Sequence, residues 1–399
     1  MPLPNAGMTT ICRGDRSVAL APPPEPIIPG RHTGLAPTHP EISHPPQKNP
    51  CNSQSMSLSF FDMKSLSYSI TSRTPIVTGD HDHRNTELQA TGILGSLRYQ
   101  YWLLKAMQVW QADPDNPVYP LYSAELPSKK GPKDPAFFTA LGAAGSVVQL
   151  FGGTNWKKMF RLEITDAERG QAQPCSARAD DKNAEKKPYQ WERLTLNVHQ
   201  DRKISFFNGT EGERIHNEVE ELMSFVHHYG WLGAAPQNGL GWVQVQGQLQ
   251  NRLNLPSDNP IFAAKDIVLT EHEADRLKDE LIDFFSEKID KVDQHWRKSR
   301  YKGSIKYIGL EPPPIGYEIR RWLRDASGLD WKRENLFFGD KNHAGCVHVS
   351  HPVAEPNRGW RLRLRFAVRP DNTGGLTPAK VTPSPRAQLD QSENLLKSI

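Results

Sequence analysis

The sequence predicts an α+β protein made of two ferredoxin-like modules with antiparallel sheets, flanked by disordered ends. Short stretches with apolar residues at every second position alternate with longer ones in which they recur every three or four positions, as strands and helices require. In the first half their order is βαββαβ with one additional helix. That order packs most simply as a split βαβ unit, with two helices on one face of the sheet.

The first module is expected at residues 63–252. Its expected elements are strand 66–72, helices 92–110 and 134–150, strands 159–165 and 193–198, helix 213–229 and strand 242–248. In the helix at 92–110, one face is apolar and carries Ile93, Leu97, Tyr101 and Leu104. Another face carries Arg98, Trp102 and Lys105, so this helix should bury one side and offer charge on the other. The polar segment from Arg169 to Pro188 should be a mobile loop.

The second module is expected at residues 253–370. Thr270 and Glu273 have the spacing of a capping box. The long helix that follows should bury a stripe of apolar residues, namely Ala274, Leu277, Leu281, Phe284, Phe285, Ile289, Val292 and Trp296. Further elements are expected as strand 304–309, helix 317–326, and strands 346–350 and 360–368. Two ferredoxin-like (RRM-like) units would thus follow each other in one chain.

Both ends are predicted to be disordered. Twelve of the 33 prolines fall within the first 50 residues, among polar residues and without apolar periodicity, so residues 1–62 should not fold. Met56 and Met63 stand just before the first strand, which fits an over-long start upstream of them. The tail at 371–399 contains several turn signals and also reads as unfolded.

Composition excludes several classes of protein. The four cysteines have no CxxC spacing, which argues against disulfide frameworks and zinc ribbons. No apolar run approaches the roughly 20 residues of a membrane helix, so a soluble, cytoplasmic protein without membrane contact is expected. Net charge is only +4, yet a nucleic-acid binder can gather its cations on one surface.

The strand at 360–368 carries the clearest surface signal. Period-two geometry places Arg361, Arg363 and Arg365 on one face, with Trp360 and its apolar neighbours on the other. Alternate residues on a strand are about 6.6 Å apart, close to the phosphate repeat of an extended single strand, so the row could follow an RNA backbone. A solvated sheet face that pairs with acids on neighbouring strands is the equal alternative.

Two further patterns have ordinary explanations. The stretch from Trp296 to Lys306 holds five cations and Tyr301, which fits phosphate contact with stacking, although basic residues are common at helix ends. His81 and His83 alternate with aspartates, but a metal site needs three or four convergent ligands, and nothing downstream completes the set. No metal, cofactor or catalytic set is predicted.

Three sequence blocks carry a resemblance to a known family. They are TPIVTG with TGILGSLRYQYW (74–79 and 91–102), QLFGGTNWKKMFRLEI (149–164) and YGWLGAAPQNGLGWVQV (229–245), with a weaker echo at 335–351. Their order and spacing resemble the repeat-associated mysterious proteins (RAMPs) of CRISPR systems, and most closely the first subunit of the type III-B Cmr RNA-targeting complex.

The resemblance implies a non-catalytic RNA-binding subunit in antiviral defence that binds guide RNA, and also target RNA, beside other CRISPR effector subunits. With the guanidinium row, the residues expected to bind RNA are Gly79, Gly92, Gly95, Arg98, Trp102, Lys105, Gly152, Lys157, Lys158, Arg161, Gly239, Gly241, Arg361, Arg363 and Arg365. Two alternatives stay open. One is a guide-RNA processing endoribonuclease that uses His81, His83 or His228 as general acid or base. The other is an assembly subunit that contacts only protein.

Overall fold

The computed structural model describes residues 65–78, 87–128, 130, 134–170, 190–200, 211–233, 239–249, 253, 259–311, 313–339, 346–357, 359–368, 381 and 383–399. The expected leader at 1–62 and most of the expected loop between Arg169 and Pro188 lie outside these residues. Residues from Phe60 to Ile399 form one compact unit. Among the described helices, none is long and apolar enough to cross a membrane.

The first sheet has the expected split βαβ order. Its elements are β1 (Ser65–Ile76), α1 (Ala90–Ala112), α2 (Pro135–Ala144), α3 (Ser146–Phe151), β2 (Phe160–Gly170), β3 (Gln190–Gln200), α4 (Glu211–Tyr229) and β4 (Val243–Gln246). The strands lie in the order β2-β3-β1-β4, and each neighbouring pair is antiparallel. Strand β3 thus separates β1 from β2, and β1 separates β3 from β4, which gives two interlocked split βαβ units.

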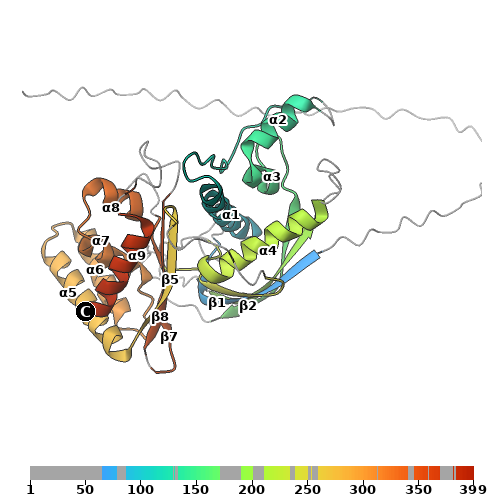
Figure 1. Ribbon diagram of the computed structural model, residues 1–399. Coiled ribbons are helices and arrows are strands. Elements are labelled where there is room, and N and C mark those ends of the chain that lie inside the picture. Colours follow the sequence, from blue (N-terminus) through green and yellow to red (C-terminus); the bar gives the residue numbers. More distant parts are fainter. Residues whose placement is uncertain are drawn as a thin grey trace, which may run out of the picture. The chain divides into compact units, whose positions relative to one another are not determined.

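Helices α1 and α4 lie over one face of this sheet (Figure 1). The apolar face expected on α1 is buried, and α4 buries a stripe that includes Ile215, Val219 and Val226. The expected helix at 134–150 is interrupted at Gly145, whose φ of 83° ends α2 and starts α3. Asp134 caps α2 by accepting hydrogen bonds from the backbone N–H groups of Ala136 and Phe137.

The second module consists of three main strands and five helices in its described part. They are β5 (Phe262–Leu269), α5 (Glu271–Asp290), α6 (His295–Ile308), α7 (Gly316–Ala326), α8 (Trp331–Phe338), β6 (His348–Val349), β8 (Trp360–Ala367) and α9 (Pro385–Ser398), with the short β7 (Val353–Ala354) also paired to β8. The sheet order is β5-β8-β6, and the pairs are antiparallel. This differs from the ferredoxin-like plan, so that expectation is met by the first sheet only.

The capping box that starts α5 is present, since Thr270 accepts from the N–H of Glu273 and the Glu273 carboxylate accepts from the N–H of Thr270. The expected strand at 304–309 is wrong, because this segment belongs to α6. Its apolar residues Tyr301 and Ile308, seven positions apart, both face the core of the second module. A helical period therefore overrides the short alternation around Ser304.

The expectation of a disordered tail is wrong for its last part. Ser384 caps helix α9 through the N–H of Ala387, and Pro385 occupies the first turn, where a proline costs no hydrogen bond. Leu389 and Leu396 are fully buried in the second core. A Ser-Pro pair that looked like a turn signal is therefore a helix start, and burial of two leucines holds the helix in place.

Candidate nucleic-acid interface

The sheet of the first module has one buried face and one polar face. Along β1, Leu66, Tyr68 and Ile70 are buried beneath the helices, whereas Ser65 and Ser67 are exposed. Strands β2 and β3 repeat this alternation, so that Arg161 lies opposite His199, and Glu163 lies opposite Asn197. Polar side chains therefore cover the second face of this sheet in the described residues.

Three of the cations expected to bind RNA lie at the start of β2. Lys157 and Arg161 are exposed, and Lys158 is partly buried. No ion pair joins any of the three to a residue that the structure describes. The nearby carboxylate of Glu163 pairs instead with His199, at 2.8 Å. These cations keep their charge available for an external anion such as a phosphate.

Arg98 binds inside the first module. Its Nε donates to the carbonyl oxygen of Tyr122 at 3.0 Å, and one terminal nitrogen donates to the carbonyl oxygen of Gly152 at 2.9 Å. The guanidinium also lies 5.2 Å from the centre of the Tyr122 ring. One side chain thus joins α1 to the loop after it and to the end of α3, which is a positioning role within the protein.

The other two residues expected on the charged face of α1 are Trp102 and Lys105. The expectation that they are exposed to solvent is wrong. Trp102 is buried, and its indole N–H donates to the carbonyl oxygen of Pro120. Lys105 forms ion pairs with Glu218 at 2.5 Å and with Glu221 at 2.8 Å. The segment around Pro120 and Tyr122 covers one part of this face and α4 covers another, so few residues of α1 are exposed.

The glycines near Arg98 have different surroundings. A Cβ atom at Gly92 would stand 2.6 Å from the carbonyl oxygen of Thr78, so this glycine lets the backbone just after β1 pass close to α1. A Cβ at Gly95 would meet nothing within 4 Å, and this position is exposed. Gly152 has a φ of 88° at the end of α3, where its backbone turns tightly. Gly79 lies outside the described residues.

The glycines of the third block contact protein. At Gly239, whose φ is 86°, an added Cβ would stand 2.5 Å from the imidazole of His351. The backbone N–H of His351 in turn donates to the carbonyl oxygen of Gly239. The carbonyl oxygen of Gly241 accepts the N–H of Leu232, and its N–H donates to the carbonyl oxygen of Pro75. These glycines therefore close the turn before β4 and contact the segment after β6, and the structure shows them enclosed by protein.

The row of guanidiniums on β8 has the expected geometry but not the expected exposure. Arg361 is partly exposed and pairs with Glu355 at 2.5 Å. Arg363 is 9% exposed and forms a bidentate ion pair with Asp266, with N–O distances of 2.7 and 3.2 Å. It also donates to the carbonyl oxygen of His227, at the end of α4. Arg363 is thus covered by protein.

Arg365 is more deeply buried, at 1% exposure. It donates to the carbonyl oxygen of Tyr229, and its guanidinium lies 4.0 Å from the centre of the Trp231 ring and 4.8 Å from that of Phe262. Burial lowers the pKa of Arg365 to about 9. The expectation of an exposed row is therefore wrong for Arg363 and Arg365, because the face of β8 that carries them packs against α4 and the segment after it.

The histidines considered as ligands or bases divide into two groups. His81 and His83 lie outside the described residues. His227 and His228 stand edge to face, 4.7 Å apart, and the Nδ1 atom of His227 accepts the backbone N–H of Val245. Burial, and then the charge of Arg363, lower the pKa of His228. No cluster of three or more metal-ligating side chains occurs among the residues that the structure describes.

Sequence reasoning passed over one group of cations that the structure brings together. Five arginines from α6 and α7 line a single pocket, namely Arg297, Arg300, Arg320, Arg321 and Arg324. Two of them belong to the basic stretch between Trp296 and Lys306, which was noted but attributed to a helix end. The signal that could have found the site is RRWLR at 320–324, a second basic helix close to the first in sequence.

Comparisons with known proteins agree with the blocks found in the sequence. Residues 69–244 match the RAMP superfamily. No curated protein sequence matches the chain. Among solved structures, the chain is similar to a subunit in the cryo-EM structure of the type III-B Cmr-beta complex bound to cognate target RNA, with 10% identity and a TM-score of 0.40, over 83% of this chain and 99% of that one.

A second structure of that complex, bound to cognate target RNA and AMPPnP in the presence of single-stranded DNA, gives the same identity and coverage with a TM-score of 0.38. The resemblance to the RAMP superfamily inferred from the sequence blocks is confirmed for residues 69–244.

Proposed function

We propose, on the premise that residues 69–244 form a RAMP-superfamily module, that this chain is a non-catalytic RNA-binding subunit of a type III CRISPR effector complex. Its ligands are guide RNA and target RNA, and its protein partners are other effector subunits. Binding is largely independent of sequence, since it depends on phosphate contacts rather than on base edges.

The observation that carries this proposal is the match of residues 69–244 to the RAMP superfamily, which covers most of the first sheet and its two covering helices. The structure supplies a surface suited to the task. Lys157 and Arg161 are exposed at the start of β2 and have no acidic partner among the described residues. Gly95 leaves open space on the outer side of α1. The exposed cations at β2 favour phosphate contacts through counterion release, and the open space at Gly95 admits close approach on a separate surface, that of α1.

The non-catalytic part of the proposal rests on the surroundings of the described histidines. His227 uses Nδ1 to accept a backbone hydrogen bond, and His228 lies close to the charge of Arg363. The two histidines contact each other ring to ring, and neither is hydrogen-bonded to a carboxylate among the described residues. The surroundings of the two histidines therefore favour RNA binding over RNA cleavage.

The test uses the full chain and end-labelled single-stranded RNA over a series of salt concentrations. Native gels measure binding, and denaturing gels run from the same mixtures measure the length of the RNA. We expect a salt-sensitive shift with intact RNA. Shortened RNA would transfer the assignment to the nuclease alternative, and no shift even at low salt would favour the protein-only assembly subunit.

The surface is tested with the double variant Lys157→Gln, Arg161→Gln. We expect weaker binding for all RNA sequences alike and a salt slope reduced by about 1 for each lost phosphate contact. The matched control is Arg386→Gln with Lys397→Gln on α9, which removes the same charge from a helix of the second module. Equal losses in the two double variants would show that only net charge matters and that the surface is misplaced.

A further inference from the structure

A pocket of about 450 Å³ lies in the second module between α6, α7 and the end of α8. Its lining consists of Arg297, Arg300, Tyr301, Tyr317, Arg320, Arg321, Arg324, Asp325 and Phe338. A volume of this size falls within the range of small-molecule sites, roughly 300–1,000 Å³. Five guanidiniums and one carboxylate around one hollow give it a strongly positive wall.

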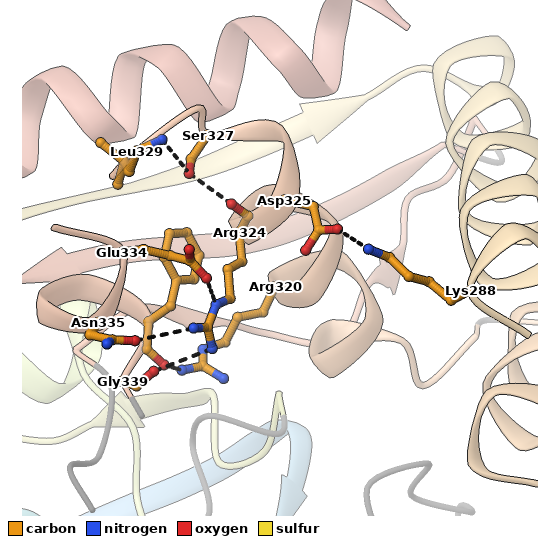
Figure 2. Close-up of polar contacts among 10 residues, drawn as sticks. Lys288, Arg320, Arg324, Asp325, Ser327, Leu329, Glu334, Asn335 and Gly339 are labelled. Atoms are coloured by element: carbon orange, nitrogen blue, oxygen red, sulfur yellow. Dashed lines mark hydrogen bonds and ion pairs between the residues drawn. The ribbon is translucent and has the colours of Figure 1, made fainter. Parts of the chain in front are cut away.

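The acidic groups near the pocket are already paired. Figure 2 shows Asp325 directed away from the arginines, towards Lys288, with which it forms an ion pair. Arg324 pairs with Glu334 and donates further to the carbonyl oxygen of Gly339 and to the side chain of Asn335. One of the five arginine charges is thus balanced by Glu334. The carboxylate of Asp325 is balanced by a lysine outside the pocket.

Arg320 carries an unbalanced charge. Its Nε donates to the carbonyl oxygen of Val347 at 3.0 Å, and a terminal nitrogen donates to the carbonyl oxygen of Phe338. Figure 2 places its guanidinium beside that of Arg324, at the turn after α8. Burial lowers the pKa of Arg320 to about 10, so this environment disfavours the charge. Neutral carbonyls orient the group, and no carboxylate among the described residues pairs with it.

Arg300 and Arg321 are positioned by aromatic rings. Arg321 lies 5.0 Å from the centre of the Tyr301 ring and 5.7 Å from that of Tyr317, and it donates to the Tyr301 hydroxyl at 3.1 Å. Arg300 lies 5.0 Å from the Tyr317 ring centre and donates to its hydroxyl at 2.6 Å. Neither arginine forms an ion pair with a described carboxylate. Rings and hydroxyls thus fix both guanidiniums and leave several of their five N–H donors unused.

We propose that this arginine pocket binds a phosphomonoester, carried by the end of an RNA strand or by a free nucleotide. A monoester has a charge of about −1.5 to −2 at pH 7 and three acceptor oxygens. It can therefore offset two of the three unbalanced guanidiniums at once. A phosphodiester within a strand has one charge and two free oxygens, so it fits the pocket less well. Guanidiniums held by rings suit planar, paired hydrogen bonds to phosphate.

Where the phosphate belongs to an RNA end, this inference rests on the proposed function. The pocket would then hold a strand terminus while the first module contacts the backbone. Where the phosphate belongs to a free nucleotide, the pocket acts independently of RNA binding. The chemistry recognised is the same in both cases, and the two sources are separated by the ligands used in the test.

The experiment compares the full chain with short single-stranded RNAs of identical sequence that end in either phosphate or hydroxyl at the 5′ or the 3′ position. Fluorescence anisotropy gives the affinity for each RNA. Thermal shift with adenosine monophosphate and with inorganic phosphate measures binding of the free ligand. We expect one phosphorylated end to bind about tenfold more tightly than its hydroxyl counterpart, or the free phosphate ligands to raise Tm.

Two variants locate the effect. Arg321→Gln and Arg300→Gln should each abolish the preference for phosphate or the thermal shift. The matched control Lys302→Gln removes one charge from an exposed position on α6 outside the pocket lining, and it should preserve both. If Arg321→Gln fails to fold, Arg300→Gln carries the test, because its described contacts are confined to Tyr317.

The outcomes separate this inference from the proposed function. Equal affinity for phosphate and hydroxyl ends, with no thermal shift from adenosine monophosphate or phosphate, overturns the pocket assignment even if RNA binds well. A thermal shift that Arg300→Gln removes, in a chain that binds none of the RNAs, supports the pocket and rejects the RNA-binding subunit. A preference that survives in both pocket variants places the phosphate site elsewhere and also overturns the assignment.

Discussion

Three arginines have three different roles in this protein, and the residues around each side chain decide its role. Arg363 is buried in an ion pair with Asp266, Arg98 joins three backbone segments through carbonyl oxygens, and Arg161 is exposed without a described acidic partner. A guanidinium can bind carboxylate, carbonyl or phosphate with the same N–H groups. Only Arg161 of the three is therefore suited to contact RNA directly.

Arg363→Met should be much more destabilising than Arg361→Met. The first change removes a nearly buried guanidinium and leaves the carboxylate of Asp266, which is 32% exposed, without its partner, so it should cost about 2 kcal/mol of unfolding free energy. The second breaks a partly exposed pair with Glu355, worth about 0–1 kcal/mol. Urea unfolding of the two variants measures the difference. Similar losses for both would contradict the burial that the structure gives to Arg363.

Arg98→Met should loosen the segment after α1. It removes two charge-assisted hydrogen bonds to the carbonyl oxygens of Tyr122 and Gly152, which should cost about 2 kcal/mol. Limited proteolysis should then cut between residues 113 and 126 faster than in the parent chain. Arg161→Gln serves as control and should leave the cleavage rate unchanged. A loss of RNA affinity in Arg98→Met without faster cleavage would return Arg98 to direct RNA contact.

At the scale of elements, α9 shows how burial decides whether a polar segment folds. Its sequence is dominated by polar residues, and a helix of 14 residues is marginal in isolation. Leu389 and Leu396, seven positions apart, both reach the core beside β5 and β8, and Lys265 of β5 pairs with Glu393 at 2.6 Å. The helices of the second module, α9 among them, gather on one side of the β5–β8 sheet (Figure 1).

Leu389→Ala should lower the unfolding free energy by about 2–5 kcal/mol, because it removes a fully buried side chain and leaves a cavity. Asn394→Ala on an exposed face of the same helix should change it by less than about 0.5 kcal/mol. Thermal unfolding of both variants tests this. An unaffected Tm in Leu389→Ala would mean that α9 does not pack on the second core.

At the scale of the whole molecule, two buried histidines of the second module, His348 and His351, contact residues of the first module. His351 accepts the N–H of Gly316 at 2.9 Å through Nδ1, and its own N–H donates to Gly239. His348 lies 4.3 Å from the Trp231 ring centre. Burial lowers the pKa of His351 to about 3, and burial together with Arg365 and Arg320 lowers the pKa of His348 well below its usual value.

Stability should therefore fall as the pH drops below 6.5. In that range the unfolded histidines take up protons while the folded ones do not, so acid favours the unfolded state, with a limiting slope of about 1.4 kcal/mol per pH unit for each histidine. The loss of stability caused by His351 is absent above pH 6.5 and reaches its full size near the folded-state pKa of about 3. Carboxylates with lowered pKa, such as Glu273, act only below about 4.5.

Urea unfolding of the parent chain and of His351→Gln at about pH 7.5 and pH 5 measures this dependence. Glutamine keeps a hydrogen-bond acceptor but does not titrate, so the variant should lose less stability between the two values. The matched control His272→Gln changes an exposed histidine in the first turn of α5 and should behave like the parent. Parallel losses in all three chains would show that His351 is accessible to solvent in the folded state.

The sequence by itself determined the first sheet, the helices that cover it and the RAMP resemblance of residues 69–244, because period and glycine turns are local signals. Strand β1, helix α1 and the capping box at Thr270 follow from residues close together in the chain. The sequence could not determine whether solvent or another element covers the polar face of each helix or strand. Arg363 and Arg365 alternate correctly on β8, yet only tertiary packing shows that α4 covers them.

The arginine pocket was likewise decided by tertiary structure. Arg300 and Arg321 lie on different helices, and nothing local indicates that both lie beside the same tyrosine ring. Helix α9 depends on burial of two leucines that a polar composition conceals. Local patterns fix the elements, since backbone geometry repeats over a few residues. Exposure, charge pairing and binding sites depend on contacts between residues far apart in the chain, and those are set only when the elements pack.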